Sequence, residues 1–240
     1  IVGRLVHDLI SPFTLNLLRW CIAFVILLPW GGYVLRKNST MWKCWKQYAV
    51  LGVLGIGCYN ALLYLALKTS SAINVTLVGS SMPIWMLLIG RIWFGTAISG
   101  RQAVGALLSV LGVAVVLSRG DVNQLLGLHL VPGDWFILLA TIVWSFYSWL
   151  LARSGQTMQG QESIRSNWVG FLMAQMLFGI AWSALITGGE AAVGDLVFVP
   201  SWQLAAAMLF IVIGPAILAY RFWGEGVRRA GPATAGFFAN

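Results

Sequence analysis

The stretch SNWVGFLMAQMLFGIAWSALITGG, residues Ser166–Gly189, contains no charged side chain over 24 positions. An α-helix rises about 1.5 Å per residue, so this run can cross the roughly 30 Å hydrocarbon core of a bilayer. Similar runs recur along the chain: Phe13–Leu35, broken only by Arg19, then Tyr48–Leu67, Thr69–Gly90, Gln102–Ser118, Trp135–Ala152 and Leu196–Tyr220. The pattern predicts an all-α membrane protein, a multi-span helical bundle with about seven complete spans.

The composition of the 240-residue chain agrees with this class. Hydrophobic residues make up 59% and charged residues only 9%, whereas soluble domains carry about 25% charged residues. The formal net charge is +8, but the basic residues lie mainly in short loops between spans, so nucleic acid is not an expected partner. The three cysteines and two histidines have neither disulfide nor metal-ligand spacing, and we expect no cofactor.

The loops between the spans alternate in basic content. Ten Lys or Arg residues fall in a set that we name the basic loops: Arg36–Lys46, Arg91–Arg101, Arg153–Arg165 and Glu225–Arg229. Only three fall in the sparse loops, which are the opening segment, Lys68–Ser71, Arg119–Val131 and Gly188–Trp202. Lys and Arg accumulate on the cytoplasmic side of membranes. We therefore predict that the basic loops are cytoplasmic and that the sparse loops face the exterior or periplasm.

This orientation puts the opening residues outside, and the final apolar run Gly231–Asn240 is about half a crossing long. We therefore expect a fragment that lacks spans at both ends. Leu51–Ser81 also resembles Leu209–Asn240. In both, a span that contains glycine and has a Tyr near its middle is followed by basic residues at its end and then by a new segment that begins with small residues. The two stretches exit on opposite sides, which is typical of the inverted repeats of secondary transporters.

Four stretches resemble EamA-type members of the drug/metabolite transporter superfamily, in order and with matching loop lengths. They are SPFTLNLLRWCIAFVILLPW (Ser11–Trp30), YNALLYLALKTSSAINVTLVGSSMP (Tyr59–Pro83), GRQAVGALLSVLGVAVVLSRGD (Gly100–Asp121) and GDWFILLATIVWSFYSWLLAR (Gly133–Arg153). The resemblance implies ten helices in the full protein, as two inverted five-helix repeats around a central cavity. On that plan residues 1–118 form the first repeat without most of helix 1, and residues 132–240 form the second repeat as far as the start of helix 9.

The resemblance also implies a secondary transporter that works by alternating access around the cavity. We expect an exporter of small metabolites, such as amino acids or their derivatives, in the bacterial inner (plasma) membrane. Its partners would be the small-molecule substrate and the lipid bilayer, with a homodimer as a further candidate assembly.

Two other classes stay open for a chain with many spans: a membrane-embedded enzyme and a seven-helix receptor-like protein. An enzyme needs paired carboxylates, a Ser/His pair or a metal cluster at membrane depth. The sequence places none there, so we predict no catalytic residue and no metal ligand. The inverted repeat argues against the receptor.

Polar side chains within spans indicate where a cavity would lie, because they usually face protein or a water-filled path. Asn60 and Tyr64 share one helix face, Trp85 follows Asn74 and Ser81 in a stripe beside Pro83, and Trp144 lies in mid-span. Tyr220 corresponds to Asn60 through the repeat. We predict that Asn60, Tyr64, Trp85, Trp144 and Tyr220 line a substrate cavity with aromatic walls and a few hydrogen-bonding groups.

Arg19 is the one basic residue well inside a predicted span, about one and a half turns from the outer end. It could anchor a substrate carboxylate or form an outer gate, but at this depth we favour an anchor that extends to the lipid head groups. Interfacial aromatic residues are common in membrane proteins. We expect this role for the tryptophans near span ends, Trp20, Trp30, Trp42, Trp45, Trp135 and Trp202.

Overall fold

A computed structural model describes residues 6, 8–118 and 131–238. Within them six helical segments are long and apolar enough to cross a membrane: Pro12–Leu35, Thr40–Thr69, Ala72–Phe94, Pro132–Ala152, Trp168–Ala192 and Trp202–Ala230. A shorter apolar helix at Gly100–Val116 corresponds to the remaining predicted span. The described residues contain no sheet, only an isolated bridge between Ile10 and Phe198. The predicted multi-span helical class is confirmed.

The first half of the chain folds as α2 (Pro12–Gly31), η1 (Gly32–Leu35), η2 (Thr40–Cys44), α3 (Trp45–Leu51), η3 (Gly52–Cys58), α4 (Tyr59–Thr69), α5 (Ala72–Gly79), α6 (Met82–Phe94) and α7 (Gly100–Leu117). The second half follows as α9 (Pro132–Ala152), α10 (Ser154–Thr157), α11 (Glu162–Ser166), α12 (Trp168–Ala192), α13 (Trp202–Ile211), η4 (Val212–Leu218), α14 (Ala219–Ala230) and α15 (Pro232–Phe237).

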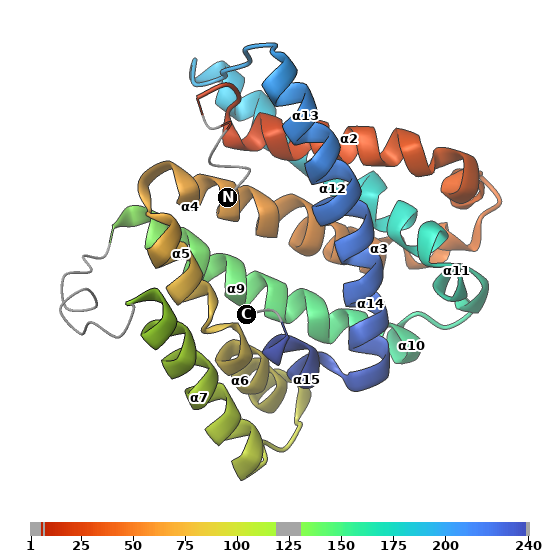
Figure 1. The fold of residues 1–240 in the computed structure, drawn as a ribbon. Coiled ribbons are helices and arrows are strands. Elements are labelled where there is room, and N and C mark those ends of the chain that lie inside the picture. The colour runs from red at the N-terminus through yellow and green to blue at the C-terminus, as the bar shows by residue number, and fades with distance from the viewer. Residues whose placement is uncertain (1–5, 7, 119–130, 239–240) are drawn as a thin grey trace.

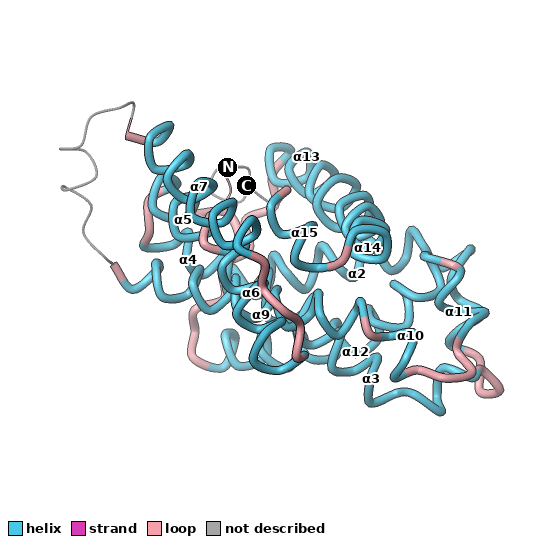
Figure 2. The backbone as a smooth tube through the Cα atoms, turned by 90° about the horizontal axis from the view of Figure 1, so that it is seen from below, coloured by secondary structure: helices cyan, strands magenta, loops and turns pink. Residues whose placement is uncertain are grey.

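The helices pack as a bundle in which α4 lies along α9, and α12 packs on both α2 and η3 (Figure 1). Figure 2 shows α13 and α14 together on one face of the bundle, on the far side of α2 from α3 and α12. The helix α7 lies at the edge, beside α5 and α6. Segments from both halves of the chain therefore meet near the middle of the bundle, where α2 contacts both α4 and η4, and α4 contacts α9.

Two of the predicted spans are not regular α-helices. In η3 and in η4 the chain forms seven-residue π-helices, which lie between α3 and α4 and between α13 and α14. The N–H of Tyr59 bonds to the carbonyl of Leu54, and the N–H of Ala219 bonds to that of Gly214, five residues back in each case. The two π-helices thus occupy equivalent positions in sequence, Leu54 matching Gly214 and Asn60 matching Tyr220. Such segments are rare and often occur at functional sites.

Several boundaries differ from the sequence prediction. The stretch Thr69–Gly90 is not one helix, because α5 ends at Gly79 and α6 begins at Met82 with Pro83 in its first turn, where a missing N–H is tolerated. The last long span begins at Trp202 and continues to Ala230, ten residues beyond the predicted Tyr220. In its charged end, Glu225 pairs with Arg228 and Arg229 at i,i+3 and i,i+4 spacing, which adds modest support to the helix.

The side chains that face outward are those expected in contact with lipid. Large apolar residues are exposed along the outer surfaces of several helices, including Val25, Val116, Leu185 and Leu209. In water such a surface would drive aggregation, whereas in a bilayer it is solvated by the acyl chains. Five of the six tryptophans assigned to span ends, namely Trp30, Trp42, Trp45, Trp135 and Trp202, are also exposed. The assignment of Trp20 is wrong, because that side chain is fully buried and packs edge-on against Tyr220.

The two loop classes lie at different ends of the bundle. Figure 1 shows the α10–α11 connection and the α14–α15 corner at the right and lower right, and the α4–α5 corner and the α12–α13 connection at the left and top. Basic loops contact one another: Gln161 donates to the Thr40 carbonyl, and Arg153 donates to the Phe94 carbonyl.

Sparse segments also contact one another. Val199 donates its backbone N–H to the Leu9 carbonyl, and Ser70 donates its hydroxyl to Asp134 in the first turn of α9, directly after the sparse loop Arg119–Val131. Residues 1–5 and 7 of the opening segment and residues 119–130 of the sparse loop Arg119–Val131 lie outside the described residues. Elsewhere the two sets predicted from charge separate in space, although which set is cytoplasmic stays a prediction.

A labelling experiment tests that orientation. In a background with Cys21, Cys44 and Cys58 replaced, Lys37→Cys and Asp195→Cys place one thiol on an exposed position of a basic and a sparse segment. In intact cells a membrane-impermeant maleimide should label Asp195→Cys and leave Lys37→Cys unlabelled. After permeabilisation both should react, which controls for local accessibility. The opposite pattern in intact cells would reverse the orientation.

Candidate functional site

Arg19 is held in the middle of the bundle by groups from two other segments. Its Nη1 donates to the Asn60 Oδ1 (3.0 Å) and to the Tyr64 hydroxyl (2.6 Å), both on α4. Its Nη2 donates to the Pro215 carbonyl in η4 at 3.4 Å. The side chain is 1% exposed. The prediction of a head-group anchor is therefore wrong: the depth would allow the side chain to reach the interface, but this face of α2 is turned toward α4 and η4.

Asn60 and Tyr220, which the sequence related through the repeat, are in direct contact. The Asn60 Nδ2 donates to the Tyr220 hydroxyl (2.9 Å) and to the Gly55 carbonyl (3.1 Å). The Tyr220 hydroxyl donates to the same Gly55 carbonyl. Both side chains are buried. A single network thus runs from Arg19 through Asn60 to Tyr220 and joins the first half of the chain to the second.

The two π-helices supply this network with backbone acceptors. The carbonyl of Gly55 in η3 accepts from Asn60 and Tyr220, and the carbonyl of Pro215 in η4 accepts from Arg19. Gly55 and Pro215 occupy equivalent positions of the two π-helices. A π-helix shifts its hydrogen bonds out of the α-helical register, which makes carbonyls available to side chains. The glycines of Gly52–Cys58 and the Gly214-Pro215 pair are the sequence signal for these irregular segments.

Aromatic side chains form one wall beside the network, with Trp144 at its centre. The ring centroid of Trp144 lies 4.4 Å from that of Tyr59, 5.3 Å from that of Tyr220 and 5.3 Å from that of Trp223. The Trp223 indole N–H donates to the Ser148 hydroxyl at 3.0 Å, which fixes its ring. These centroid separations are close to or within the range of favourable aromatic pairs.

A partly open cavity of about 680 Å³ lies between the network and this wall. Four of the five predicted cavity residues line it, together with Arg19 and residues that the sequence analysis did not single out. The lining consists of Arg19, Tyr59, Asn60, Leu63, Tyr64, Leu67, Met82, Trp144, Phe210, Ile211, Pro215, Ala219, Tyr220, Trp223 and Phe238. Cavities of 300–1,000 Å³ with mostly apolar walls and a few converging polar groups are typical of small-molecule sites.

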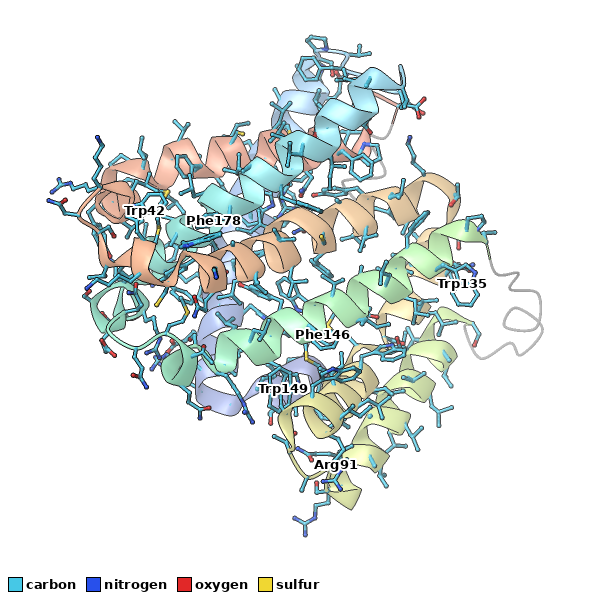
Figure 3. All side chains as sticks on the ribbon, turned by 180° about the vertical axis from the view of Figure 1, so that it is seen from behind. Trp42, Arg91, Trp135, Phe146, Trp149 and Phe178 are labelled. Carbon is cyan, nitrogen blue, oxygen red and sulfur yellow. The ribbon has the colours of Figure 1, made fainter. Side chains whose placement is uncertain are left out.

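Trp85 is the predicted residue that does not line the cavity. The prediction treated Asn74, Ser81 and Trp85 as one stripe on a single helix, but α5 and α6 are separate helices. Asn74 instead donates to Asp134 at 3.0 Å, and Met82 is the residue of α6 that reaches the cavity. Other aromatic residues that face α6 come from α9: Phe146 and Trp149 lie between these two helices (Figure 3), and the Trp149 indole donates to the Met86 carbonyl.

Tyr59 and Trp223 were missed as lining residues for different reasons. Tyr59 is adjacent to Asn60 in sequence, so a regular helix would not place both on the same face. The π-helix before Tyr59 and the position of α9 bring its ring against Trp144. Trp223 lies three residues after Tyr220 on α14, a spacing that places both on one helix face. That spacing is visible in the sequence, but the predicted span ends at Tyr220.

The fold is that of a multi-pass membrane protein, with a partly open cavity that both halves of the chain line. Residues 1–118 match the EamA-like transporter family. An uncharacterized transporter of Bacillus subtilis strain 168, YyaM, is 25% identical over 206 residues, which are 86% of this chain and 63% of that protein. An uncharacterized transporter of Synechocystis sp. PCC 6803, sll1164, is 23% identical over 228 residues, 91% of this chain and 61% of that protein.

A solved crystal structure of a protein has the same fold, with a TM-score of 0.66 at 20% sequence identity over 99% of this chain and 77% of that chain. The match to the EamA-like transporter family over residues 1–118, together with relatives that are named as transporters, confirms the resemblance seen in the sequence. The chain spans 63% and 61% of the length of the two relatives described above.

Proposed function

We propose that this chain forms the substrate site of a secondary transporter of small metabolites, such as amino acids or their derivatives. The observation that carries the proposal is the cavity itself, which has apolar and aromatic walls, is lined by both halves of the chain, and contains one hydrogen-bonded network with a guanidinium. The guanidinium of Arg19 would hold a substrate carboxylate, and the aromatic wall around Trp144 would contact the rest of the solute.

The proposed architecture is a pair of inverted repeats, residues 1–118 and 132–240, with ten helices in the whole protein. The matching π-helices η3 and η4 support it, because they interrupt two long spans at equivalent sequence positions. Interrupted helices at the repeat interface are the usual location of substrate sites in transporters with this symmetry.

In alternating access, the halves of the protein would move relative to each other around the bound substrate. Asn60 and Tyr220 would link the two halves in the state described by the structure, since their hydrogen bond joins α4 to α14. The proposed location is the inner (plasma) membrane of a bacterium, with export as the direction. Prokaryotic relatives of this kind support that location. A homodimer stays a candidate assembly.

Counterflow in proteoliposomes tests the function. Vesicles containing the protein and preloaded with an unlabelled solute should take up the same labelled solute faster than protein-free vesicles, and uptake should saturate. The solutes to compare are amino acids, N-acetyl amino acids and aromatic carboxylates. If no solute of this panel shows protein-dependent counterflow, the proposed function is wrong.

A further inference from the structure

Arg19 is a buried cation without a carboxylate partner in the part of the chain that the structure describes. Its three acceptors are neutral: the amide oxygen of Asn60, the hydroxyl of Tyr64 and the carbonyl of Pro215. Its Nε has no hydrogen-bond partner there. An uncompensated charge in a low-dielectric interior costs several kcal/mol. Neutral side chains could link these helices by hydrogen bonds equally well. A charged side chain at this position therefore indicates that an anion compensates its charge.

The acidic residues that the structure describes do not supply that anion. The sequence has seven Asp and Glu residues, and Asp121 lies outside the described residues. None of the other six lines the cavity: Asp8, Asp134, Glu162, Glu190, Asp195 and Glu225. The two that are buried already accept hydrogen bonds elsewhere, Glu190 from Ser11 at 2.7 Å and Asp134 from Asn74 at 3.0 Å.

The remaining polar groups on the cavity wall favour an acceptor rather than an ammonium. Tyr64 accepts from Arg19, which leaves its own hydroxyl proton to donate, and the indole N–H of Trp144 is a donor only. An ammonium could instead sit over an aromatic ring. However, the Arg19 guanidinium already lies 5.8 Å from the Tyr64 ring centroid, and the Trp144 ring packs against Tyr59, Tyr220 and Trp223. A second cation in this cavity would be repelled by Arg19.

From these contacts we infer that the cavity selects solutes with a net negative charge, a carboxylate on an aromatic or apolar body, over zwitterions and cations of the same shape. This inference rests on the proposed function, since it assigns the substrate class of the same cavity. Arg19 would bind the carboxylate, and Trp144 with its neighbours would contact the body. Free amino acids would then be poorer substrates than derivatives in which the amine is absent or acylated.

Three probes with one indole body and different charges test this selection. They are indole-3-propionate, an anion; L-tryptophan, a zwitterion; and tryptamine, a cation. Binding to the purified protein in nanodiscs is measured by equilibrium dialysis at neutral pH. We expect indole-3-propionate to bind at least about tenfold more tightly than tryptophan, which corresponds to about 1.4 kcal/mol, and tryptamine to bind most weakly. Hexanoate, norleucine and pentylamine repeat the comparison with a smaller body.

Variants at Arg19 separate charge selection from cavity shape. Arg19→Gln should weaken indole-3-propionate binding by more than about tenfold and leave tryptamine binding unchanged or stronger. Arg19→Lys should keep part of the preference, because the charge remains while the two-nitrogen fork is lost. Arg36→Gln is the matched control: it removes the same charge at an exposed position after η1 and should change neither affinity. If Arg19→Gln does not fold, Arg19→Lys and the two probe series still report the charge preference.

The binding and counterflow measurements distinguish failure of the charge selection from failure of the proposed transport. The charge selection would be overturned if tryptophan bound as tightly as indole-3-propionate or more tightly, or if either amine bound preferentially. It would also be overturned if neither carboxylate bound, or if folded Arg19→Gln kept the full preference for the anion. Saturable counterflow of any solute under those outcomes would leave the proposed function standing. Conversely, Arg19-dependent binding of indole-3-propionate without counterflow of any solute would support the selection and contradict transport.

Discussion

Gly52→Leu should prevent the bundle from assembling. Gly52 is the first residue of η3, where this helix crosses α12 so closely that a Cβ would collide with the Gln175 carbonyl and lie 2.9 Å from the Gly179 backbone nitrogen. Gly179 is equally constrained, because a Cβ at that position would lie only 2.8 Å from the Gly52 carbonyl oxygen. Close approach of small residues is how helices associate in lipid, where no hydrophobic force drives them together. Because the obstructing atoms are backbone, a side-chain rotation cannot relieve the overlap.

The expected cost is at the upper end of the range for overpacking, about 3 kcal/mol or more. In the folding assay, the variant should lose the monodisperse peak in size-exclusion chromatography in detergent, or melt far below the parent protein. Gly112→Leu is the matched control: it makes the same substitution in α7, where a Cβ meets nothing within 4 Å, and should retain the parent profile. Normal folding of Gly52→Leu would show that the α12–η3 crossing is looser than described.

Trp144→Ala should reduce transport per folded molecule by more than about tenfold. Trp144 is 6% exposed and contacts Tyr59, Tyr220 and Trp223, so its removal leaves a gap in the cavity wall. A truncated core Trp also costs about 3–5 kcal/mol of stability, so the yield of folded protein should fall as well. Trp144→Phe should keep most of the packing and show an intermediate loss.

The measurement is counterflow normalised to the monodisperse protein recovered in each preparation. Trp135→Ala is the matched control, since it removes the same side chain from the exposed start of the same helix, α9, and should leave transport unchanged (Figure 3). Equal counterflow in the two variants would remove Trp144 from the substrate site. The similarity to the EamA-like transporter family would be unaffected by that result.

Much of the architecture could be predicted because it depends on local chemistry. Apolar runs such as Ser166–Gly189 predict spans from length alone, since the bilayer thickness sets the number of residues needed. The basic loops separate from the sparse loops because the chain crosses between them each time. The relation of Asn60 to Tyr220 was also visible, since it depends only on sequence similarity between Leu51–Ser81 and Leu209–Asn240.

The site could be predicted only in part, because lining a cavity depends on the rotation of each helix about its axis. Two errors show this. Depth alone assigned Arg19 to the lipid interface, but it faces Asn60, Tyr64 and Pro215. Trp85 was assigned to the cavity on a stripe that continued through residue 80, where α5 has already ended. Depth can be counted along a sequence, whereas facing direction depends on the neighbours against which a helix packs.

The sequence alone was enough to predict a multi-span membrane protein, the approximate positions of its spans, and the polar residues that lie inside them. These properties follow from the free-energy cost of placing charges and unpaired backbone groups in hydrocarbon. That cost depends on the composition of each segment and not on its neighbours in the fold. Only the tertiary structure decided that Gly55 and Pro215 present carbonyls to a shared network and that Arg19 lies among neutral groups. Those features depend on contacts between residues up to 196 positions apart, and no local property of either partner specifies such a contact.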